Sequence, residues 1–209
     1  MKKVLLGIII SLMVVSGLVA DEKSGCVLSQ KGKIDVSWKA YKTASKIGVS
    51  GVFNKVTYTP VAKNGKNFRE ILVGSSVSID TSSVNSKNKS RDFKLVSFFF
   101  QKMSTKNINA KIIDIKADKK IKNQPRTGVV TLDVTMNGIT KSLPMKYTYS
   151  NAIFEAKGVI DILDFSASTA LKSINKACYA LHKGKTWSDV SVGFRTKIEA
   201  SLCNVSPLK

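Results

Sequence analysis

The sequence predicts an all-β protein folded as a closed antiparallel barrel. Three features support this: apolar and polar residues alternate with a period of two along most of the chain, short polar turns join the alternating segments, and only two segments change to a helical period. Half-buried strands of this kind require either a sandwich or a barrel, and short connections between successive strands favour an up-and-down barrel. We therefore predict an eight-stranded antiparallel β-barrel.

The positions of the strands follow from the alternation. The predicted strands span residues 33–41, 47–53 with an extension that ends at Pro60, 71–79, 108–117, 130–136, 139–149, 153–163 and 188–202. In the fourth strand the apolar phase shifts by one residue between Ile112 and Ile113, which indicates a β-bulge. Asn137-Gly138 separates two alternating segments and predicts a two-residue hairpin, because both residue types adopt positive φ at low cost.

Two segments have helical spacing instead. Leu95, Phe98 and Phe99 follow Arg91-Asp92 at i, i+3 and i+4, so they lie on one face of a short aromatic helix that caps the barrel. Between residues 166 and 181, the apolar residues form one stripe with a period of 3.6. This stripe predicts an amphipathic helix before the last strand.

The first 20 residues predict a secretory signal peptide. Lys2 and Lys3 precede an apolar stretch that ends at Ala20 and is followed by charged residues. An uncleaved membrane anchor is the alternative. We expect residues 21–209 to form the mature protein as one domain.

The chain is strongly basic, with a formal net charge of +20. Removing Lys2 and Lys3 from the 34 basic residues leaves 32 against 14 acidic ones, which is +18. Nearly all the basic residues are scattered lysines, without an arginine cluster for bidentate phosphate binding. We expect an anionic membrane surface or an acidic headgroup as a partner and no nucleic acid, since an exported protein rarely meets it. A purely solubilising surface is the alternative.

Three cysteines in an exported chain predict one disulfide and one free thiol. Cys26 precedes the first strand and Cys203 ends the last, and these two strands are neighbours in a closed barrel. Cys26–Cys203 is therefore the favoured pair, and pairs that use Cys178 remain alternatives. A zinc site formed by the three cysteines and His182 would lack any C-x-x-C pair, so we expect no metal.

The inward-facing positions mix large and small side chains. Large apolar residues such as Trp38 and Phe154 share their parity with Ala40, Ala156 and Gly158. An eight-stranded barrel either fills its interior with side chains or leaves room for one ligand. The pattern alone favours a filled core and leaves a cavity as the alternative.

Several motifs resemble one known family. They are ILVGSSVSIDTSSVNSKNKSRDFKLVSFF from residue 71, the NGITK segment at 137–141 and Asp161-x-x-Asp164-Phe165. Together they are similar to the YceI-like family of periplasmic, lipocalin-like barrels that bind polyisoprenoids. The resemblance implies a lipocalin-like barrel in the periplasm that carries or stores a long-chain isoprenoid or similar amphiphile, with its tail in the barrel. It implies no cofactor, and it leaves a homodimer open.

The resemblance also implies which residues contact the ligand. Phe98 and Phe99 would close the channel, while Arg91, Lys183 and Lys185 would lie near the headgroup. The expected ligand-binding residues are Trp38, Phe53, Arg91, Phe98, Phe99, Met136, Met145, Phe154, Gly158 and Phe194.

Two other functions remain as alternatives. A filled barrel would serve only as a structural or interaction module. His182, Ser188 and Asp189 would be the residues of a lipid-ester hydrolase, but no nucleophile elbow or triad spacing accompanies them, so we expect no catalytic residues and no enzyme.

Overall fold

The computed structural model of the protein describes residues 27–201, apart from the side chain of His182. The predicted signal peptide, Cys26 and Cys203 therefore lie outside the described residues. None of the helices within 27–201 is long and apolar enough to cross a membrane.

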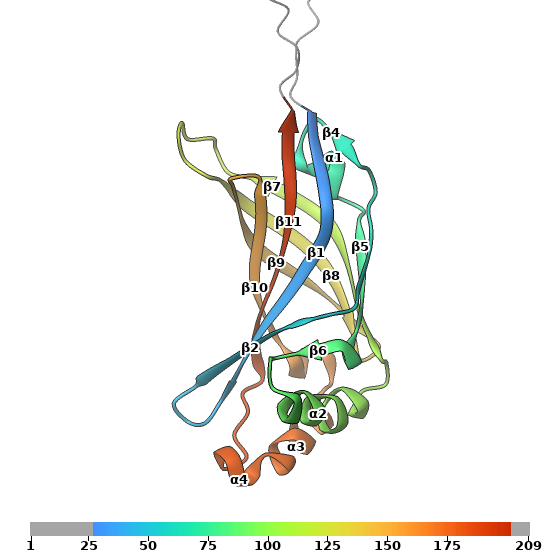
Figure 1. Cartoon of the computed structure of the whole chain (residues 1–209), viewed down its shortest axis with the longest axis vertical. Helices are drawn as coiled ribbons and strands as arrows, with labels where there is room; N and C mark the ends of the chain where they lie inside the picture. The colour runs from blue at the N-terminus through green and yellow to red at the C-terminus, as the bar shows by residue number, and fades with distance from the viewer. Residues whose placement is uncertain (1–26, 202–209) are drawn as a thin grey trace, which may run out of the picture.

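A single antiparallel sheet curls into a barrel (Figure 1). Its strands are β1 (Val27–Lys42), β2 (Ile47–Phe53), β3 (Val56–Thr59), β4 (Asn64–Gly65), β5 (Ser76–Asp80), β6 (Val84–Asn85), β7 (Asn107–Ala117), β8 (Arg126–Met136), β9 (Ile139–Ser150), β10 (Ile153–Asp161) and β11 (Asp189–Ser201). The order of hydrogen-bonded neighbours is β3-β5-β7-β8-β9-β10-β11-β1-β2-β6, and β4 pairs with β1.

The two flanks of this sheet are continuous in the chain, because only Asn54 and Lys55 separate β2 from β3. The β2–β3 segment pairs with β1 through its first part and with β5 through its second. When the β2–β3 segment is counted as one strand, this strand and the seven other strands of the barrel follow the predicted up-and-down order. The all-β, eight-stranded barrel is therefore confirmed, with β4 and β6 as short additions.

The sequence signals for turns and bulges are confirmed. Asn137 and Gly138 have φ of 53° and 77°, and they connect β8 to β9 in the register that pairs Met136 with Ile139. The register between β7 and β8 shifts between Ile112 and Asp114, where the change of apolar phase predicts a bulge. At the seam of the barrel, Val27 pairs with Ser201, so the first and last strands lie side by side.

The predicted strand at 71–79 is wrong in its first part. Residues Phe68–Leu72 form a short helix, α1, and the strand β5 begins only at Ser76. The Asn67 side chain accepts a hydrogen bond from the Glu70 backbone N–H, and Glu70 accepts one from the Lys66 backbone N–H. These two hydrogen bonds start a helix where the alternation of Ile71 and Val73 alone favours a strand.

The other helices gather at the opposite end of the barrel from α1 (Figure 1). They are α2 (Lys89–Phe98), the 3₁₀ turns η2 (Phe100–Lys102) and η3 (Ile162–Phe165), α3 (Ser168–Ala177) and α4 (Tyr179–His182), and we call this group the cap. A further 3₁₀ turn, η1 (Thr81–Ser83), connects β5 to β6. The aromatic helix α2 is confirmed. The predicted helix at 166–181 is two helices that break at Cys178, and the seventh strand ends at Asp161 rather than Leu163.

A tightly packed aromatic cluster fills the barrel at the α1 end. The ring of Phe68 lies 5.2 Å from Phe154 and 4.9 Å from Tyr149 between centroids, and Tyr147 stacks on Phe154 at 4.7 Å. Phe154 also stacks on Phe194 at 5.9 Å. Since Phe154 is fully buried, this end of the barrel is filled by side chains.

Candidate functional site

The barrel interior is hollow between the aromatic cluster and the cap. A cavity of about 110 Å³, which we call the barrel chamber, exposes only apolar atoms on its wall. Its lining includes Trp38, Phe53, Met136, Met145 and Phe194, which the sequence assigns to the ligand. Inward parity on β1, β2, β8, β9 and β11 therefore brings these five residues together.

A second apolar cavity of about 110 Å³, the cap chamber, lies between the barrel rim and the cap. Leu95, Phe99 and Phe100 line it from the cap side, and Trp187 lines it from the segment that precedes β11. The two chambers are neighbours that share six lining residues: Trp38, Phe53, Ile108, Met136, Ile160 and Val192. Met136, one of these shared residues, has an unbranched side chain that adapts to different shapes.

A larger opening of about 350 Å³ leads to the cap chamber from the surface between α2 and α3. It shares Trp38 and Ala40 with the cap chamber, and its rim carries Lys42, Arg91 and Lys94. Within residues 27–201, none of these three cations forms an ion pair with a carboxylate. The site is thus a row of two apolar chambers behind a basic opening.

Trp38 lies where all of these spaces meet, and Gly51 makes room for it. A Cβ atom added to Gly51, which pairs with Trp38 across β1 and β2, would overlap the indole ring. The Trp38 Nε1–H is buried and finds no hydrogen-bond partner among the described residues. It is therefore an unpaired donor covered by the apolar side chains around the chambers.

Arg91 has a structural contact in addition to its place at the opening. Its Nε–H donates to the Ser86 hydroxyl at 2.7 Å, and its Nη2 donates to the Ser86 carbonyl at 2.8 Å. Asp92 accepts a hydrogen bond from the Ser86 backbone N–H at 2.9 Å. Arg91 and Asp92 therefore both bind Ser86, the residue that follows β6, and fasten α2 to it. They do not form an ion pair with each other.

Three of the expected ligand-binding residues lie away from the chambers. Phe154 is packed in the aromatic cluster, and Phe98 is partly buried on α2 without lining either chamber. A Cβ atom on Gly158 would point at Met145, only 2.9 Å from its Cγ.

Lys183 and Lys185, which are expected near the headgroup, follow α4 and do not line the opening. The Lys185 Nζ instead lies 4.3 Å from the Trp187 ring centroid.

Sequence reasoning misses Tyr58, Phe100 and Trp187. Tyr58 lines the barrel chamber, where burial raises the pKa of its hydroxyl. Trp187 is held in the wall of the cap chamber by hydrogen bonds from its Nε1–H to the Thr43 carbonyl and from its backbone N–H to the Tyr41 carbonyl. Phe100 stands directly beside the predicted Phe98–Phe99 pair, and its aromatic neighbours are the only sequence signal for it.

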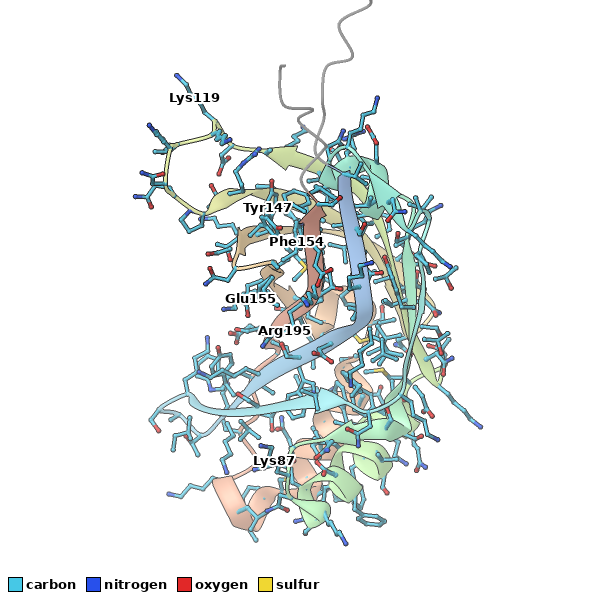
Figure 2. The ribbon with its side chains drawn as sticks, turned by 45° about the horizontal axis from the view of Figure 1, so that its top comes forward. Lys87, Lys119, Tyr147, Phe154, Glu155 and Arg195 are labelled. Carbon is cyan, nitrogen blue, oxygen red and sulfur yellow. The ribbon has the colours of Figure 1, made fainter. Side chains whose placement is uncertain are left out.

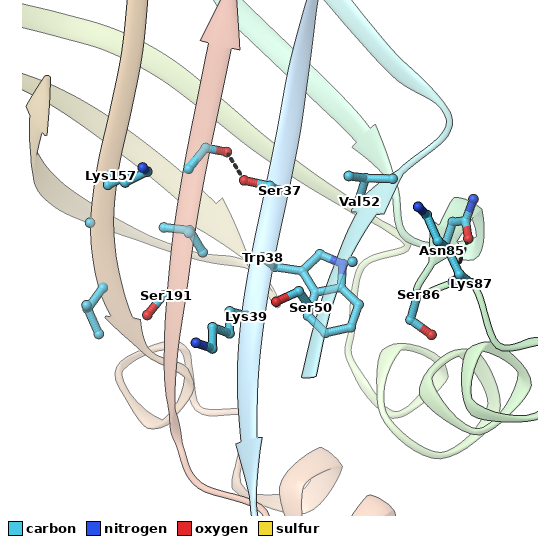
Figure 3. Close-up of a pocket in the computed structure, with 15 residues that line it drawn as sticks. Ser37, Trp38, Lys39, Ser50, Val52, Asn85, Ser86, Lys87, Lys157 and Ser191 are labelled. Carbon is cyan, nitrogen blue, oxygen red and sulfur yellow. Dashed lines mark hydrogen bonds between the residues drawn. The ribbon is translucent and has the colours of Figure 1, made fainter. Parts of the chain in front are cut away.

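The largest hollow, about 770 Å³, is a groove on the outer face of the barrel (Figure 3). The labelled side chains of Ser37, Lys39, Val52 and Lys157 come from the outward-facing positions of β1, β2 and β10. Gly158 contributes to this groove and not to the chambers. The groove is more open to solvent than the chambers, and its wall exposes polar as well as apolar atoms, so it would enclose an apolar tail less completely.

The residues of the hydrolase alternative are engaged elsewhere. Ser188 Oγ donates to the Asp161 carboxylate at 3.1 Å, and Asp189 pairs with Lys46 at 2.7 Å.

Cys178 is a buried free thiol at the junction of α3 and α4. No group of three or more His, Cys, Asp or Glu side chains in the described part of the chain is arranged to hold a metal ion. The Cys26–Cys203 pair remains a prediction.

The chain resembles known proteins both in sequence and in fold. A polyisoprenoid binding domain from Saccharophagus degradans, implicated in plant cell wall breakdown, has a similar structure: the TM-score is 0.57 at 12% identity, over 83% of this chain and 98% of that one. BcnA of Burkholderia cenocepacia gives a TM-score of 0.53 at 14% identity, over 79% and 96%. No protein with a curated description matches. The YceI-like domain matches residues 29–202, which is most of the chain, and the chain therefore belongs to the YceI-like family.

Proposed function

We propose that the protein is a periplasmic carrier or store of a long-chain isoprenoid or a similar amphiphile, with the tail held in the barrel. The observation that carries the proposal is the pair of neighbouring chambers whose walls expose only apolar atoms. The polyisoprenoid binding of the Saccharophagus degradans domain supports the same class of ligand. Export rests on the basic and apolar segment at residues 1–20.

The size of the driving force favours a long tail. Burial of each methylene contributes about 0.8 kcal/mol, so ten of them would contribute roughly 8 kcal/mol. Association costs about 4–15 kcal/mol before any affinity is observed. A short chain would therefore bind weakly, whereas an isoprenoid of several units would exceed the cost.

The chambers must widen to hold such a tail. Each measures about 110 Å³, whereas ligand pockets usually measure about 300–1,000 Å³. Met136 and Met145 line the barrel chamber, and their unbranched side chains adapt to different shapes. The helix α2 has no buried residue, so displacing it removes no side chain of the buried core. We therefore expect the tail to move both the methionines and the cap.

The polar head would remain at the opening between α2 and α3. Lys42, Arg91 and Lys94 lie there without a carboxylate partner in the described chain, so they favour an anionic or strongly polar group. Arg91 has part of its guanidinium committed to Ser86, which leaves Lys42 and Lys94 as the more available cations.

Native mass spectrometry of protein purified from the periplasm tests the proposal. The wild type should retain a lipid whose mass corresponds to a long apolar chain. Ala110→Leu fills part of the barrel chamber and should reduce the retained fraction, whereas Ala117→Leu, on an exposed position of the same strand, should not. A wild-type protein that carries no lipid under these conditions would contradict the carrier function, and equal loss in both variants would place the lipid elsewhere.

A further inference from the structure

Large apolar side chains are exposed on the cap. Phe93 on α2 is 65% exposed, and Tyr179 and Leu181 on α4 are 69% and 68% exposed. Leu163 of η3 adds a fourth, at 48%. Phe93, Tyr179 and Leu181 contribute little to the core, because most of their surface is in water, so packing of the fold does not explain them.

The cap is also strongly basic. The segments 86–106 and 162–188 carry ten lysines and arginines but only Asp92 and Asp164 as acidic residues. The Asp92 carboxylate is occupied by Ser86. Within residues 27–201, none of the cations of these two segments is within ion-pair distance of a carboxylate. The positive charge of the cap is therefore not neutralised by the protein.

Exposed lysines and exposed apolar side chains occur together on the α3–α4 segment. Lys172 and Lys176 are exposed and four residues apart, which places them on one side of α3, and the exposed Tyr179 begins α4 directly after the break at Cys178. Ala170 and Ile174 are buried on the inward side of α3. An apolar and cationic outer face is typical of helices that lie at a membrane interface.

The opening of the ligand site is part of the same surface. Lys94 and Leu181 both line the opening between α2 and α3. The cap forms one end of the molecule, and the loop between β7 and β8 lies at the other, as the positions of Lys87 and Lys119 show in Figure 2. Contact through the cap would therefore bring the opening, and not the closed aromatic end, to the partner.

We propose that the cap is a membrane-docking surface that places the opening of the ligand site against an anionic lipid bilayer. Phe93, Tyr179 and Leu181 insert between the headgroups, and the lysines around them bind the lipid phosphates. Transfer of an amphiphile through this opening rests on the proposed carrier function, whereas docking of the empty protein does not. An acidic protein partner would use the charge but would not need exposed side chains in two separate helices.

The loop between β7 and β8 supplies a matched control. It carries Lys119, Lys120 and Lys122 around Ile121, which is 66% exposed, so it offers the same residue types at the opposite end. If net charge alone drove binding, neutralising three lysines in either place would have the same effect. The docking proposal predicts a large difference between the two places.

Flotation of lipid-free protein with vesicles tests the proposal. The vesicles contain either phosphatidylcholine alone or phosphatidylcholine mixed with phosphatidylglycerol. The cap variant carries Lys94→Gln, Lys183→Gln and Lys185→Gln, and the loop variant carries Lys119→Gln, Lys120→Gln and Lys122→Gln. A third variant carries Phe93→Ser, Tyr179→Ser and Leu181→Ser, with Ile121→Ser as its control. Circular dichroism and the melting temperature confirm that each variant is folded.

Binding should require phosphatidylglycerol and weaken as salt is added. Each lysine near an anionic surface contributes roughly fivefold, so the cap variant should bind on the order of 100-fold more weakly and the loop variant nearly as well as the wild type. The serine variant should lose about tenfold or more, and its control little. Equal losses in the cap and loop variants, full binding by the serine variant, or no binding by the wild type would each overturn the proposal. Lipid retention in native mass spectra is measured separately, so a wild type that retains lipid but does not bind the vesicles would contradict the docking surface and leave the carrier function standing.

Discussion

The two halves of the barrel are built from strands with the same alternation, yet one is filled and the other is hollow. At the α1 end, Phe68, Tyr147 and Phe154 form an aromatic cluster with centroid distances of 4.7–6.0 Å. At the cap end, Trp38 and Phe53 border two cavities. The difference lies in the helices rather than in the strands.

The helix α1 has only five residues but buries Phe68, Ile71 and Leu72 inside the barrel. The helix α2 has ten residues, and none of them is fully buried. A short inserted helix thus supplies the side chains that fill one half, whereas a longer helix laid across the rim leaves the other half empty. A barrel of this size tolerates both solutions within one chain.

The largest test of this contrast is a matched pair of phenylalanine truncations. Phe154→Ala removes a fully buried ring from the packed half and should destabilise the lipid-free protein by about 3–5 kcal/mol. Phe53→Ala, in the hollow half, removes a partly buried ring that already borders empty space, so it should cost roughly 1–2 kcal/mol. Urea denaturation of both variants measures the two values. Similar losses in the two halves would contradict the contrast.

The reverse change, from a small to a larger side chain, gives a second test of the contrast between the packed and the hollow half. Ala156 is fully buried beside the aromatic cluster, and Ala156→Leu should cost about 1–3 kcal/mol through overpacking. Ala110 lines the barrel chamber, so Ala110→Leu fills existing space and should leave the lipid-free stability nearly unchanged. Thermal unfolding of delipidated protein distinguishes them, and a clear loss for Ala110→Leu would show that the chamber is not available space.

The alternation predicts the barrel and much of the chamber wall, because parity within one strand decides which side chains point inward. Trp38, Met136 and Met145 are found this way. The same parity places Phe154 inside but cannot tell a packed position from one on a cavity wall, since that depends on α1. Tyr58 is missed because Asn54 and Lys55 interrupt the strand and shift its parity.

The helix α1 illustrates a second limit of the periodicity. Five residues hold little more than one turn, so Ile71 and Val73 fit a strand as well as a helix. The signal that distinguishes the two is the spacing of Asn67 and Glu70, which matches a capping box. The position of Trp187 depends on hydrogen bonds with the β1–β2 hairpin, which lies more than a hundred residues earlier in the sequence.

The cap of α1 gives a prediction of intermediate size. Asn67→Ala removes the acceptor for the Glu70 backbone N–H and should destabilise the protein by about 1 kcal/mol. Because α1 fills the packed half, hydrogen exchange should increase around Phe68–Leu72 and not in α2. Asn88→Ala, at the N-terminus of α2, is the matched control, since its side chain accepts from the Arg91 backbone N–H in the same way. Exchange in α2 should rise in that variant instead.

The smallest expected effect concerns the ion pair that fastens α1 to the bulge in β7. Arg69 pairs with Asp114, and its hydrogen bond holds the pKa of that carboxyl below its usual value. A carboxyl whose pKa is lower in the folded state stabilises the fold above its unfolded pKa of about 4, and the stabilisation is lost as the pH falls through the folded value. The melting temperature of Asp114→Asn should therefore lie below that of the wild type at neutral pH, and the difference should shrink below about pH 4.

Because both side chains are partly exposed, added salt should reduce the difference at neutral pH as well. Arg69→Met should show the same pH dependence, and the double variant should lose no more than the single ones if the pair acts as a unit. A difference that stays constant from neutral to acidic pH would assign the effect to packing of the Arg69 side chain instead of to the charge on Asp114.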